Sequence, residues 1–290
     1  KWMRTAYGEK LREFLLTDTA LLQLIDFKGK QVFEATVDTN MVLLSKGRAD
    51  PAQPLLVGSD LPGVETPLVF MPQGHLNKQS FNLDSAAVHA LKAKIEAQGV
   101  PLKDWEVKIN YGIKTSSNEA FIIDTATKEQ LCEEDPQSAE ILKPILRGRD
   151  MKRYGYQWAG LWLINSHNNP PVQIDDYPAV KKHLDNYYPQ LEKRLDKGQT
   201  PYNLRNCAYL QEFEKEKVVW AEMTNDSCFS WDDTGILINQ TGYFMPNASK
   251  YLLGLLNSKA IYFYFSKIAT ELGNGAFRWI KQFVEQIPIP

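Results

Sequence analysis

The chain has 290 residues, of which 43% are hydrophobic and 11% aromatic, and its formal net charge is −2. This length and composition suffice for a packed core in one large domain or two ordinary ones. No apolar run approaches the ~20 residues of a membrane span, and no basic-then-apolar leader begins the chain. We therefore expect a globular, cytoplasmic protein, and because the first residue is Lys1 we expect a piece of a longer chain.

The three cysteines, Cys132, Cys207 and Cys228, are an odd number without C-x-x-C spacing. Such a set indicates neither a disulfide framework nor a thiolate metal site. The four histidines have no zinc-ligand spacing, and no G-x-S-x-G sequence is present. The sequence therefore predicts no metal site and no catalytic nucleophile in this chain.

The first 50 residues carry the patterns of one helix and two strands. Between Trp2 and Leu16 the apolar residues recur at intervals of three and four, which predicts an amphipathic helix. The nearly continuous apolar runs at 20–27 and 40–45 predict strands that are covered on both faces. Because so short a segment cannot supply these covers, we expect the tail of an α/β domain, with strands that pack on the domain that follows in this chain or on another copy of the chain.

Residues 48–83 have the composition of a linker or an irregular segment, with many prolines and few long apolar runs. We therefore expect a domain boundary in this region. It divides the chain into residues 1–50, a linker or irregular segment 51–82, and a second domain 83–290. The prolines concerned are Pro51, Pro54, Pro62, Pro67 and Pro72.

Helical and strand patterns alternate at the start of the second domain. Asp84 is predicted to cap a helix that ends at Gly99. Two strands, 105–115 and 119–125, are predicted to follow, joined by the polar turn "SSN". This alternation of segments favours a mixed α+β fold.

The rest of the chain continues the same mixture. A helix is predicted for 135–146, with Asp135 as its N-cap and Pro136 at its first position, where the missing N–H costs nothing. The other predicted strands are 160–165, 216–222, 228–231 and 235–239. The other predicted helices are 177–198, with a break before Pro189, and 249–258 and 261–270.

The stretch "LKPILRGRDMKRY", residues 142–154, concentrates positive charge in a chain that is slightly acidic overall. Its cations are Lys143, Arg147, Arg149, Lys152 and Arg153. One interpretation is a solvated face at the end of a helix, as most charge runs are. The other is a surface that binds an anionic partner.

Two short sequences raise enzymatic alternatives. "NNPPV", residues 168–172, resembles the Asn-Pro-Pro-aromatic turn of N6-adenine methyltransferases, but Val172 stands where the aromatic residue would stack on the base. Glu106 and Lys108 have the E-x-K spacing of metal-dependent nucleases, with Asp84 upstream as a second carboxylate. Asp84 is already explained as a helix cap, and E-x-K is frequent by chance, so this nuclease remains the weaker alternative.

Taken in order, several segments resemble adenine-methylating, bifunctional type II restriction-modification enzymes. They include "YGEKLREFLL", "LIDFKGKQVFEATVDTNMVLL", "NYGIKTSSNEAFIID", "SAEILKPILRGRDMKRY", "YPAVKKHLDNYYPQLEKR" and the long C-terminal segment from "YLLGLLNSK" to "EQIPIP". The part after the linker resembles the TaqI-like C-terminal specificity domain of these enzymes. The resemblance implies the end of a Rossmann-like methyltransferase sheet in residues 1–50, followed by an α/β target-recognition domain with C-terminal helices.

The family combines an S-adenosylmethionine-dependent N6-adenine methyltransferase with a domain that recognises the DNA target, and some members carry a Mg²⁺-dependent nuclease upstream. This chain departs from the family pattern because it has neither the glycine-rich cofactor motif nor the Asn-Pro-Pro-aromatic motif. We therefore expect a non-catalytic chain that binds no cofactor itself, within a parent enzyme that uses S-adenosylmethionine, and Mg²⁺ if a nuclease is fused. A protein-interaction module, as in specificity subunits, remains the alternative.

Double-stranded DNA and the missing part of the same enzyme are then the expected partners. DNA binding requires cations for phosphates and side chains that reach base edges, and arginine can serve both purposes. The predicted DNA-binding residues are Arg147, Arg149, Lys152 and Arg153 in the basic stretch, Lys114, Thr115, Ser116 and Asn118 in the polar turn, and Arg278 and Lys281 after the turn "LGNGAF". Tyr154, Tyr156 and Trp158 follow the basic stretch at alternate positions and either support it or stack on nucleic acid.

Overall fold

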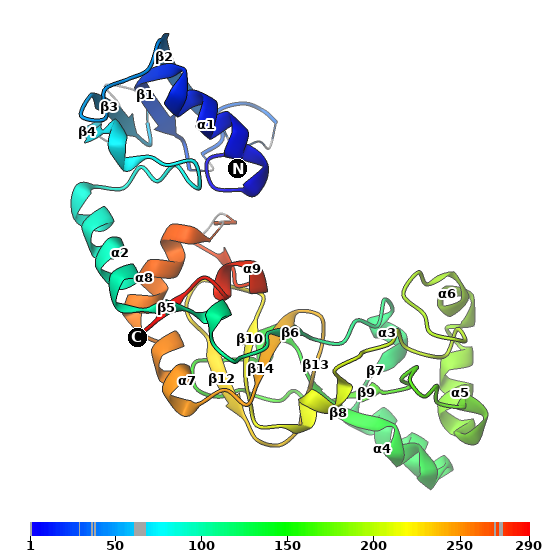
Figure 1. The fold of residues 1–290 in the computed structure, drawn as a ribbon. Helices are drawn as coiled ribbons and strands as arrows, with labels where there is room; N and C mark the ends of the chain where they lie inside the picture. The colour runs from blue at the N-terminus through cyan, green and yellow to red at the C-terminus, as the bar shows by residue number, and fades with distance from the viewer. Residues whose placement is uncertain are drawn as a thin grey trace. The chain divides into compact units, whose positions relative to one another are not determined.

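The computed structural model describes residues 2–28, 30–35, 37, 39–60, 68–269, 271–272 and 275–290. The chain forms two compact units. The first unit comprises residues 1–100, 263–277 and 290, and the second comprises 101–262 and 278–289. Both contain helices and strands, so the mixed α/β fold class is confirmed (Figure 1). No helix within the described ranges is long and apolar enough to cross a membrane.

A four-stranded sheet forms the body of the first unit, in the order β2-β1-β3-β4. Its strands are β1 (Thr19–Asp26), β2 (Asn40–Lys46), β3 (Pro54–Gly58) and β4 (Val69–Pro72). β1 pairs antiparallel with β2 and parallel with β3, and β3 pairs antiparallel with β4. The predicted strands at 20–27 and 40–45 are therefore confirmed. β3 and β4 lie in the segment that we expected to be a linker.

The expectation of an irregular segment is wrong at these two strands because the apolar residues there alternate between the prolines. Leu55, Val57 and Met71 are buried and pack in a cluster with Leu21 and Leu24 of β1. Pro54 and Pro72 lie opposite each other at the ends of the β3–β4 pair, where proline is tolerated. Pro62 and Pro67 are outside the described residues, and the proposed domain boundaries stay a prediction.

Burial of the first sheet also differs from the expectation. β1 is largely buried, and its apolar side chains pack on other residues of the first unit, so for this strand the expected cover is supplied within that unit. β2 is exposed along most of its length, and Leu43 is 52% exposed. The prediction of a strand at 40–45 is therefore correct, but the prediction that both of its faces are buried is wrong.

Helix α1 (Glu9–Thr17) begins later than the sequence periodicity predicts. The side chain of Arg12 is buried and donates hydrogen bonds to the carbonyl oxygens of Trp2, Thr5 and Lys78, the last two at 2.9 and 2.7 Å. The carbonyl groups of Trp2 and Thr5 thereby accept hydrogen bonds from a side chain. The chain at 2–5 consequently forms turns that precede the helix.

Two helices complete the first unit and lie side by side in Figure 1, α2 (Ala86–Gln98) and the end of α8 (Lys259–Ile268). Asp84 does not cap α2 as predicted, because Ser85 occupies the N-cap position and Asp84 forms an ion pair with Lys267 at 3.0 Å. Tyr264 donates a hydrogen bond to Glu96 at 3.1 Å.

Two four-stranded sheets organise the second unit. The first has the order β12-β10-β14-β6, with antiparallel pairs throughout, and the second has the order β13-β8-β9-β7. Their strands are β6 (Asn110–Tyr111), β7 (Ile122–Asp124), β8 (Leu142–Leu146), β9 (Leu161–Ile164), β10 (Lys217–Ala221), β12 (Phe229–Asp232), β13 (Leu237–Ile238) and β14 (Gly242–Pro246). A continuous apolar core joins residues of both sheets, including Ile145, Leu163, Val219 and Phe244.

Short helices surround these sheets. They are α3 (Asn118–Phe121), α4 (Thr125–Glu134), α5 (Pro178–Asp185), α6 (Tyr188–Lys193), α7 (Lys250–Leu256) and α9 (Lys281–Val284). The remaining short strands of the chain are β5 (Val100–Pro101), β11 (Met223–Thr224), β15 (Phe277–Arg278) and β16 (Pro288–Ile289). The predicted break before Pro189 is confirmed, since α5 and α6 are separate helices.

The predictions for 105–146 need correction in three places. Only residues 110–111 of the predicted strand 105–115 pair as a strand, and Asn118 begins a helix, so the polar turn does not join two strands. Asp135 caps a helix as predicted, but this is a short 3-10 helix, Pro136–Glu140. β8 follows, because Pro144 cannot continue a helix while the apolar residues around it pair well as a strand.

Candidate nucleic-acid interface

The basic stretch forms a tight hairpin, residues 147–158, which follows β8 directly and is called the basic hairpin below. Gln157 N–H donates to the carbonyl of Asp150 at 2.8 Å, and Lys152 N–H donates to the carbonyl of Gly155 at 2.8 Å. Met151 and Tyr156 form an antiparallel bridge between these two bonds. The chain therefore turns back on itself at residues 152–155. The cations do not follow the end of the predicted helix 135–146, because residues 142–146 form β8, but Arg147 caps and Arg149 lies within a short 3-10 helix, Gly148–Asp150.

Arg147 and Asp150 fix the base of the basic hairpin. The Arg147 guanidinium donates to both carboxylate oxygens of Asp150, at 3.0 and 2.8 Å, and the Arg147 backbone N–H donates to the same carboxylate at 2.8 Å. Burial alone would raise the pKa of the Asp150 carboxyl, but the hydrogen bonds from Arg147 outweigh this effect and lower it. Asp150 is thus held ionised, and the guanidinium of Arg147 is occupied within the protein.

Gly148 brings the hairpin close to the loop before β14. Its N–H donates to the hydroxyl of Thr241 at 2.8 Å, and a Cβ atom at this position would lie 2.6 Å from the carbonyl oxygen of Thr241. Any larger residue would push these two segments apart. The glycine therefore permits contact with the protein's own backbone, which provides a reason for it that does not involve a ligand.

β12 holds the far end of the basic hairpin. The hydroxyl of Ser230 lies 2.5 Å from the carbonyl oxygen of Lys152 and 2.7 Å from that of Gly155, and it can donate to either. Tyr154 N–H donates to the carbonyl of Phe229 at 2.7 Å. These hydrogen bonds to β12 hold the turn on both sides of Tyr154 and restrict the movement of the turn.

A buried ion pair supports this attachment. Lys217 and Asp232 are both fully buried and form an ion pair, and the hydroxyl of Tyr156 donates to Asp232 at 2.7 Å. Burial would raise the pKa of Asp232, but the hydrogen bonds from Lys217, Thr234 and Tyr156 lower it, so the carboxylate stays charged. Burial and Asp232 together raise the pKa of Tyr156 to about 12. Tyr156 therefore supports the hairpin from within.

The exposed basic side chains of the hairpin differ in the hydrogen bonds and ion pairs that they form within the protein. Arg149 makes no side-chain hydrogen bond or ion pair within the described residues. Lys152 Nζ donates to the carbonyl of Arg149 at 3.2 Å, and Arg153 pairs with Asp226 at 2.7 Å. A cavity of about 170 Å³ is lined by Arg149, Asp150, Lys152, Gln157, Trp158 and Ala159. Arg149 is thus the arginine of this hairpin that can offer its whole guanidinium to a ligand.

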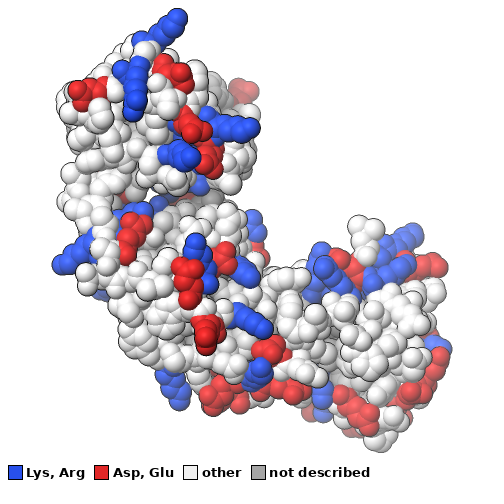
Figure 2. Space-filling model, in the orientation of Figure 1, with Lys and Arg blue, Asp and Glu red and all other residues white. Residues whose placement is uncertain are grey.

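The predicted polar turn forms a second cationic site around Asp196. Lys114 pairs with Asp196 at 2.5 Å, Arg205 does so at 3.4 Å, and the Ser116 hydroxyl donates to it at 3.0 Å. Figure 2 shows Lys and Arg side chains gathered over the region of α3 and α6, with Asp and Glu gathered near α4. Lys114 and Ser116 can reach a ligand only as part of this charge cluster.

Thr115 and Asn118 are placed differently from their neighbours. Thr115 is fully buried, and its hydroxyl donates to Asn118 Oδ1 at 2.7 Å. The guanidinium of Arg194 donates to the Thr115 carbonyl at 2.5 Å, and burial lowers the pKa of Arg194 to about 10. The side chain of Thr115 therefore shapes the turn and offers nothing to a ligand. No pattern in the sequence marked Arg194 or Asp196 as partners of this turn.

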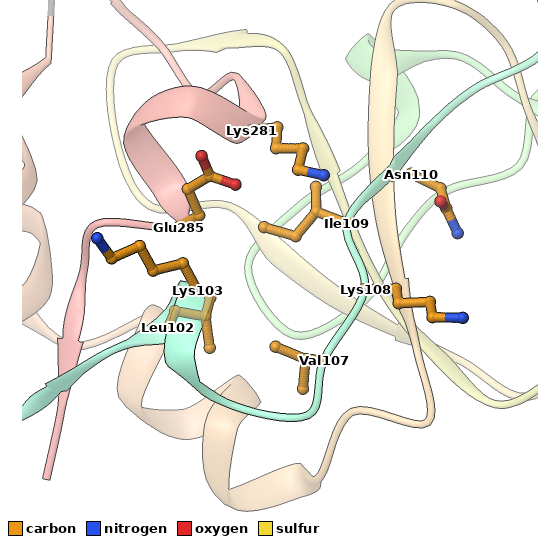
Figure 3. A pocket seen from close by; sticks show the side chains of 8 residues that line it. All are labelled: Leu102, Lys103, Val107, Lys108, Ile109, Asn110, Lys281 and Glu285. Atoms are coloured by element: carbon orange, nitrogen blue, oxygen red, sulfur yellow. The ribbon is translucent and has the colours of Figure 1, made fainter.

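Arg278 and Lys281 lie near the C-terminus, and the structure does not place them in the basic hairpin. Arg278 is paired with Glu222. Lys281 lines a cavity of about 260 Å³ together with Leu102, Lys103, Val107, Lys108, Ile109, Asn110 and Glu285. In Figure 3 the ammonium groups of the three lysines point in different directions, so the cavity does not concentrate positive charge. The glycine turn before Arg278 includes residues 273 and 274, which are outside the described residues.

The two enzymatic alternatives also have a structural outcome. Glu106 and Lys108 lie in a non-strand segment, and Asp84 is paired with Lys267, so the strand that the nuclease hypothesis needs is not formed. No group of three His, Cys, Asp or Glu side chains suited to a metal ion occurs within the described part of the chain. In the "NNPPV" loop, Asn168 accepts the Gln199 N–H at 2.7 Å and Val172 packs on the core, which explains both residues structurally.

Comparison with known families assigns the part of the chain that carries these features to a described domain family. The model of the TaqI-like C-terminal specificity domain matches residues 143–289, which include the basic hairpin. The chain belongs to this family of restriction-modification specificity domains.

Two solved restriction-modification enzymes are similar to the chain in structure. The type IIL enzyme MmeI, solved in complex with DNA, superimposes with a TM-score of 0.60 at 12% identity, over 93% of this chain and 35% of MmeI. The type IIG endonuclease BpuSI gives a TM-score of 0.47 at 14% identity, over 100% of this chain and 39% of that enzyme. The likeness to MmeI shows a shared fold, and the chain spans about a third of the length of MmeI.

Proposed function

We propose that the second unit binds duplex DNA and selects a target sequence through the basic hairpin. The observation that carries this proposal is Arg149, whose guanidinium is unoccupied on a turn that Arg147, Ser230 and Asp232 hold in place. A fixed backbone with a free guanidinium suits bidentate hydrogen bonds to a guanine edge. Membership of a specificity-domain family supports the same function, as does the fold shared with MmeI, which was solved with DNA.

The other cations of the hairpin suit phosphate contacts. Lys152 presents a compact ammonium group, which neutralises a phosphate but discriminates poorly between bases. Arg153 is paired with Asp226 and would exchange this carboxylate for a phosphate on binding. Because the net charge of the chain is −2, we expect weak binding by the chain alone and stronger binding with the rest of the enzyme.

We further infer that the parent enzyme methylates adenine N6 with S-adenosylmethionine, and that Mg²⁺ serves a nuclease if one is fused. The described residues of the first unit do not fit the cofactor. Among the residues described between β1 and β3, no helix follows a strand, so no strand-to-helix turn of the kind that binds such nucleotides is found there. We therefore propose that methyl transfer takes place in a part of the enzyme other than the described residues of this chain.

Selection from a pool of random-sequence duplexes tests the proposal. The 290-residue chain is expected to enrich one sequence motif, and Arg149→Ala is expected to lose the preference at one position while its thermal unfolding stays unchanged. Lys152→Ala should instead weaken binding to all sequences and flatten the log–log salt dependence by about 0.9. If the wild-type chain enriches no motif, or if Arg149→Ala enriches the same motif with the same affinity, target selection by this hairpin is wrong.

A further inference from the structure

Tyr154 lies at the turn of the basic hairpin and has an unusual backbone. Its φ is +71°, in the left-handed region that bulky side chains rarely adopt. The neighbouring Gly155 does not have positive φ, and a Cβ atom there would meet nothing within 4 Å. The chain thus places the tyrosine, and not the adjacent glycine, at the position where glycine would be unstrained.

The conformation of Tyr154 is imposed by its surroundings. Its N–H donates to Phe229, and the hydroxyl of Ser230 binds the carbonyl groups of Lys152 and Gly155 on either side. A strained residue that its neighbours hold in place is typical of functional sites, where the strain sets the position of one side chain. The question is what the tyrosine ring does there.

The side chain of Tyr154 makes no hydrogen bond, ring pair or cation–π contact with the described residues. The residue is 55% exposed. Tyr156, two residues later, differs because its hydroxyl donates to buried Asp232. Tyr156 therefore supports the fold of the hairpin, whereas the ring of Tyr154 presents an exposed aromatic surface.

From this arrangement we infer that Tyr154 stacks on the face of a nucleobase in the bound DNA. The inference rests on the proposed function, because the cations beside Tyr154 would hold the DNA backbone against the hairpin. An aromatic ring on a fixed turn can enter an opened base step or cover a base that has left the stack, and both require the same exposed base face. Stacking does not need the tyrosine hydroxyl, which agrees with the absence of a partner for it.

Three variants of the 290-residue chain test the role of Tyr154. Tyr154→Asn removes the ring but keeps a residue that accepts the left-handed backbone, and Tyr154→Phe keeps the ring but removes the hydroxyl. Tyr7→Asn is the control, because Tyr7 is also exposed, at 72%, and lies at residues 6–8, outside the hairpin. The probe is the duplex selected by the wild-type chain, with 2-aminopurine replacing one base of the motif and its flanks at a time.

Wild type and Tyr154→Phe are expected to raise the 2-aminopurine fluorescence at one position, which reports unstacking. Tyr154→Asn should lose this rise and bind about 5- to 150-fold more weakly, the range for removing an aromatic side chain that stacks on one base. Its melting temperature should not fall, since asparagine relieves the strain. Tyr7→Asn should behave as wild type.

The outcomes separate the two proposals. A duplex that is bound and selected, but shows no unstacking with wild type or the same unstacking with Tyr154→Asn, overturns the role of Tyr154 and leaves target selection standing. If Tyr154→Phe also lost the rise in 2-aminopurine fluorescence, the effect would depend on the hydroxyl and not on the ring. That outcome would overturn stacking too. Failure of the wild-type chain to select any duplex overturns the proposed function first.

Discussion

At the scale of single residues, Arg147 and Arg149 show how position gives two identical side chains different tasks. Arg147 is bound by Asp150 through both its guanidinium and its backbone N–H, whereas Arg149 projects from the same turn without a partner in the described chain. The sequence predicted that either could contact a base edge. The structure favours Arg149 for contact and Arg147 for positioning, because breaking the Arg147–Asp150 pair would leave a buried carboxylate uncompensated.

Asp150→Asn tests this positioning role through stability and its dependence on pH. The change should lower the free energy of unfolding at neutral pH by about 1–3 kcal/mol, because Arg147 loses its charged partner while asparagine keeps the shape. The pKa of Asp150 is lowered in the folded state, so its contribution is complete above the ordinary carboxyl pKa of 3.8 and is lost as the pH falls through the lowered value.

The measurement is urea unfolding of wild type and Asp150→Asn between neutral pH and the lowest pH at which both remain folded. The difference between the two should be constant at neutral pH and shrink below about pH 4. A difference that stays constant down to the lowest pH would mean that Asp150 does not act through its charge. Lys152→Ala, which removes an exposed cation and its solvent-accessible hydrogen bond to the Arg149 carbonyl, is expected to change stability by less than about 0.5 kcal/mol.

At the scale of elements, the basic hairpin depends on β10 and β12 more than on its own sequence. The Lys217–Asp232 ion pair is buried between these strands, and Tyr156 connects it to the hairpin. Compared with apolar residues of similar size, a fully buried ion pair contributes little net stability to the fold. Removing only one of its two charges is costly, because the other charge is left buried without a partner. Its arrangement here suits a role in fixing one geometry of the turn.

Asp232→Asn should therefore destabilise the chain by about 3–5 kcal/mol, because the buried Lys217 ammonium loses its counter-charge. Amide hydrogen exchange at residues 150–157 should become faster than in wild type, since Tyr156 loses a charged acceptor. Lys215→Ala is the matched control, because Lys215 forms a partly exposed pair with Glu212 at 2.9 Å, whose loss should cost at most about 1 kcal/mol. Equal effects of the two changes would contradict the positioning role of the buried pair.

How much of these elements could be predicted from the sequence depends on how local their causes are. β1, β10, α5 and the Asp135 cap follow from apolar runs, proline positions and short polar side chains, all of which act within a few residues. The basic hairpin was predicted as a cationic surface but at a helix end, because the sequence does not show that Ser230 and Asp232 lie behind it. The same holds for Thr115, which is hidden by its contact with Arg194, 79 residues further along the chain.

At the scale of the whole molecule, charge is unevenly distributed and the local pattern matters more than the net value. The chain carries 33 Lys and Arg against 35 Asp and Glu, so general attraction to DNA is weak. Binding must then come from the arrangement of a few cations, of which Arg149 and Lys152 are the least occupied in the basic hairpin. A protein of this kind is expected to discriminate between sequences well but to bind all of them modestly.

The last prediction concerns the cofactor of the proposed parent enzyme. Since no helix follows a strand among the residues described between β1 and β3, this chain should not bind S-adenosylmethionine. Isothermal calorimetry of the chain with S-adenosylmethionine, alone and with the selected duplex, should give no saturable heat, while the duplex alone does. Saturable binding in the micromolar range would show that residues 1–100 contain a cofactor site that neither their sequence pattern nor their sheet connections indicate, and methyl transfer by this chain would then have to be measured directly.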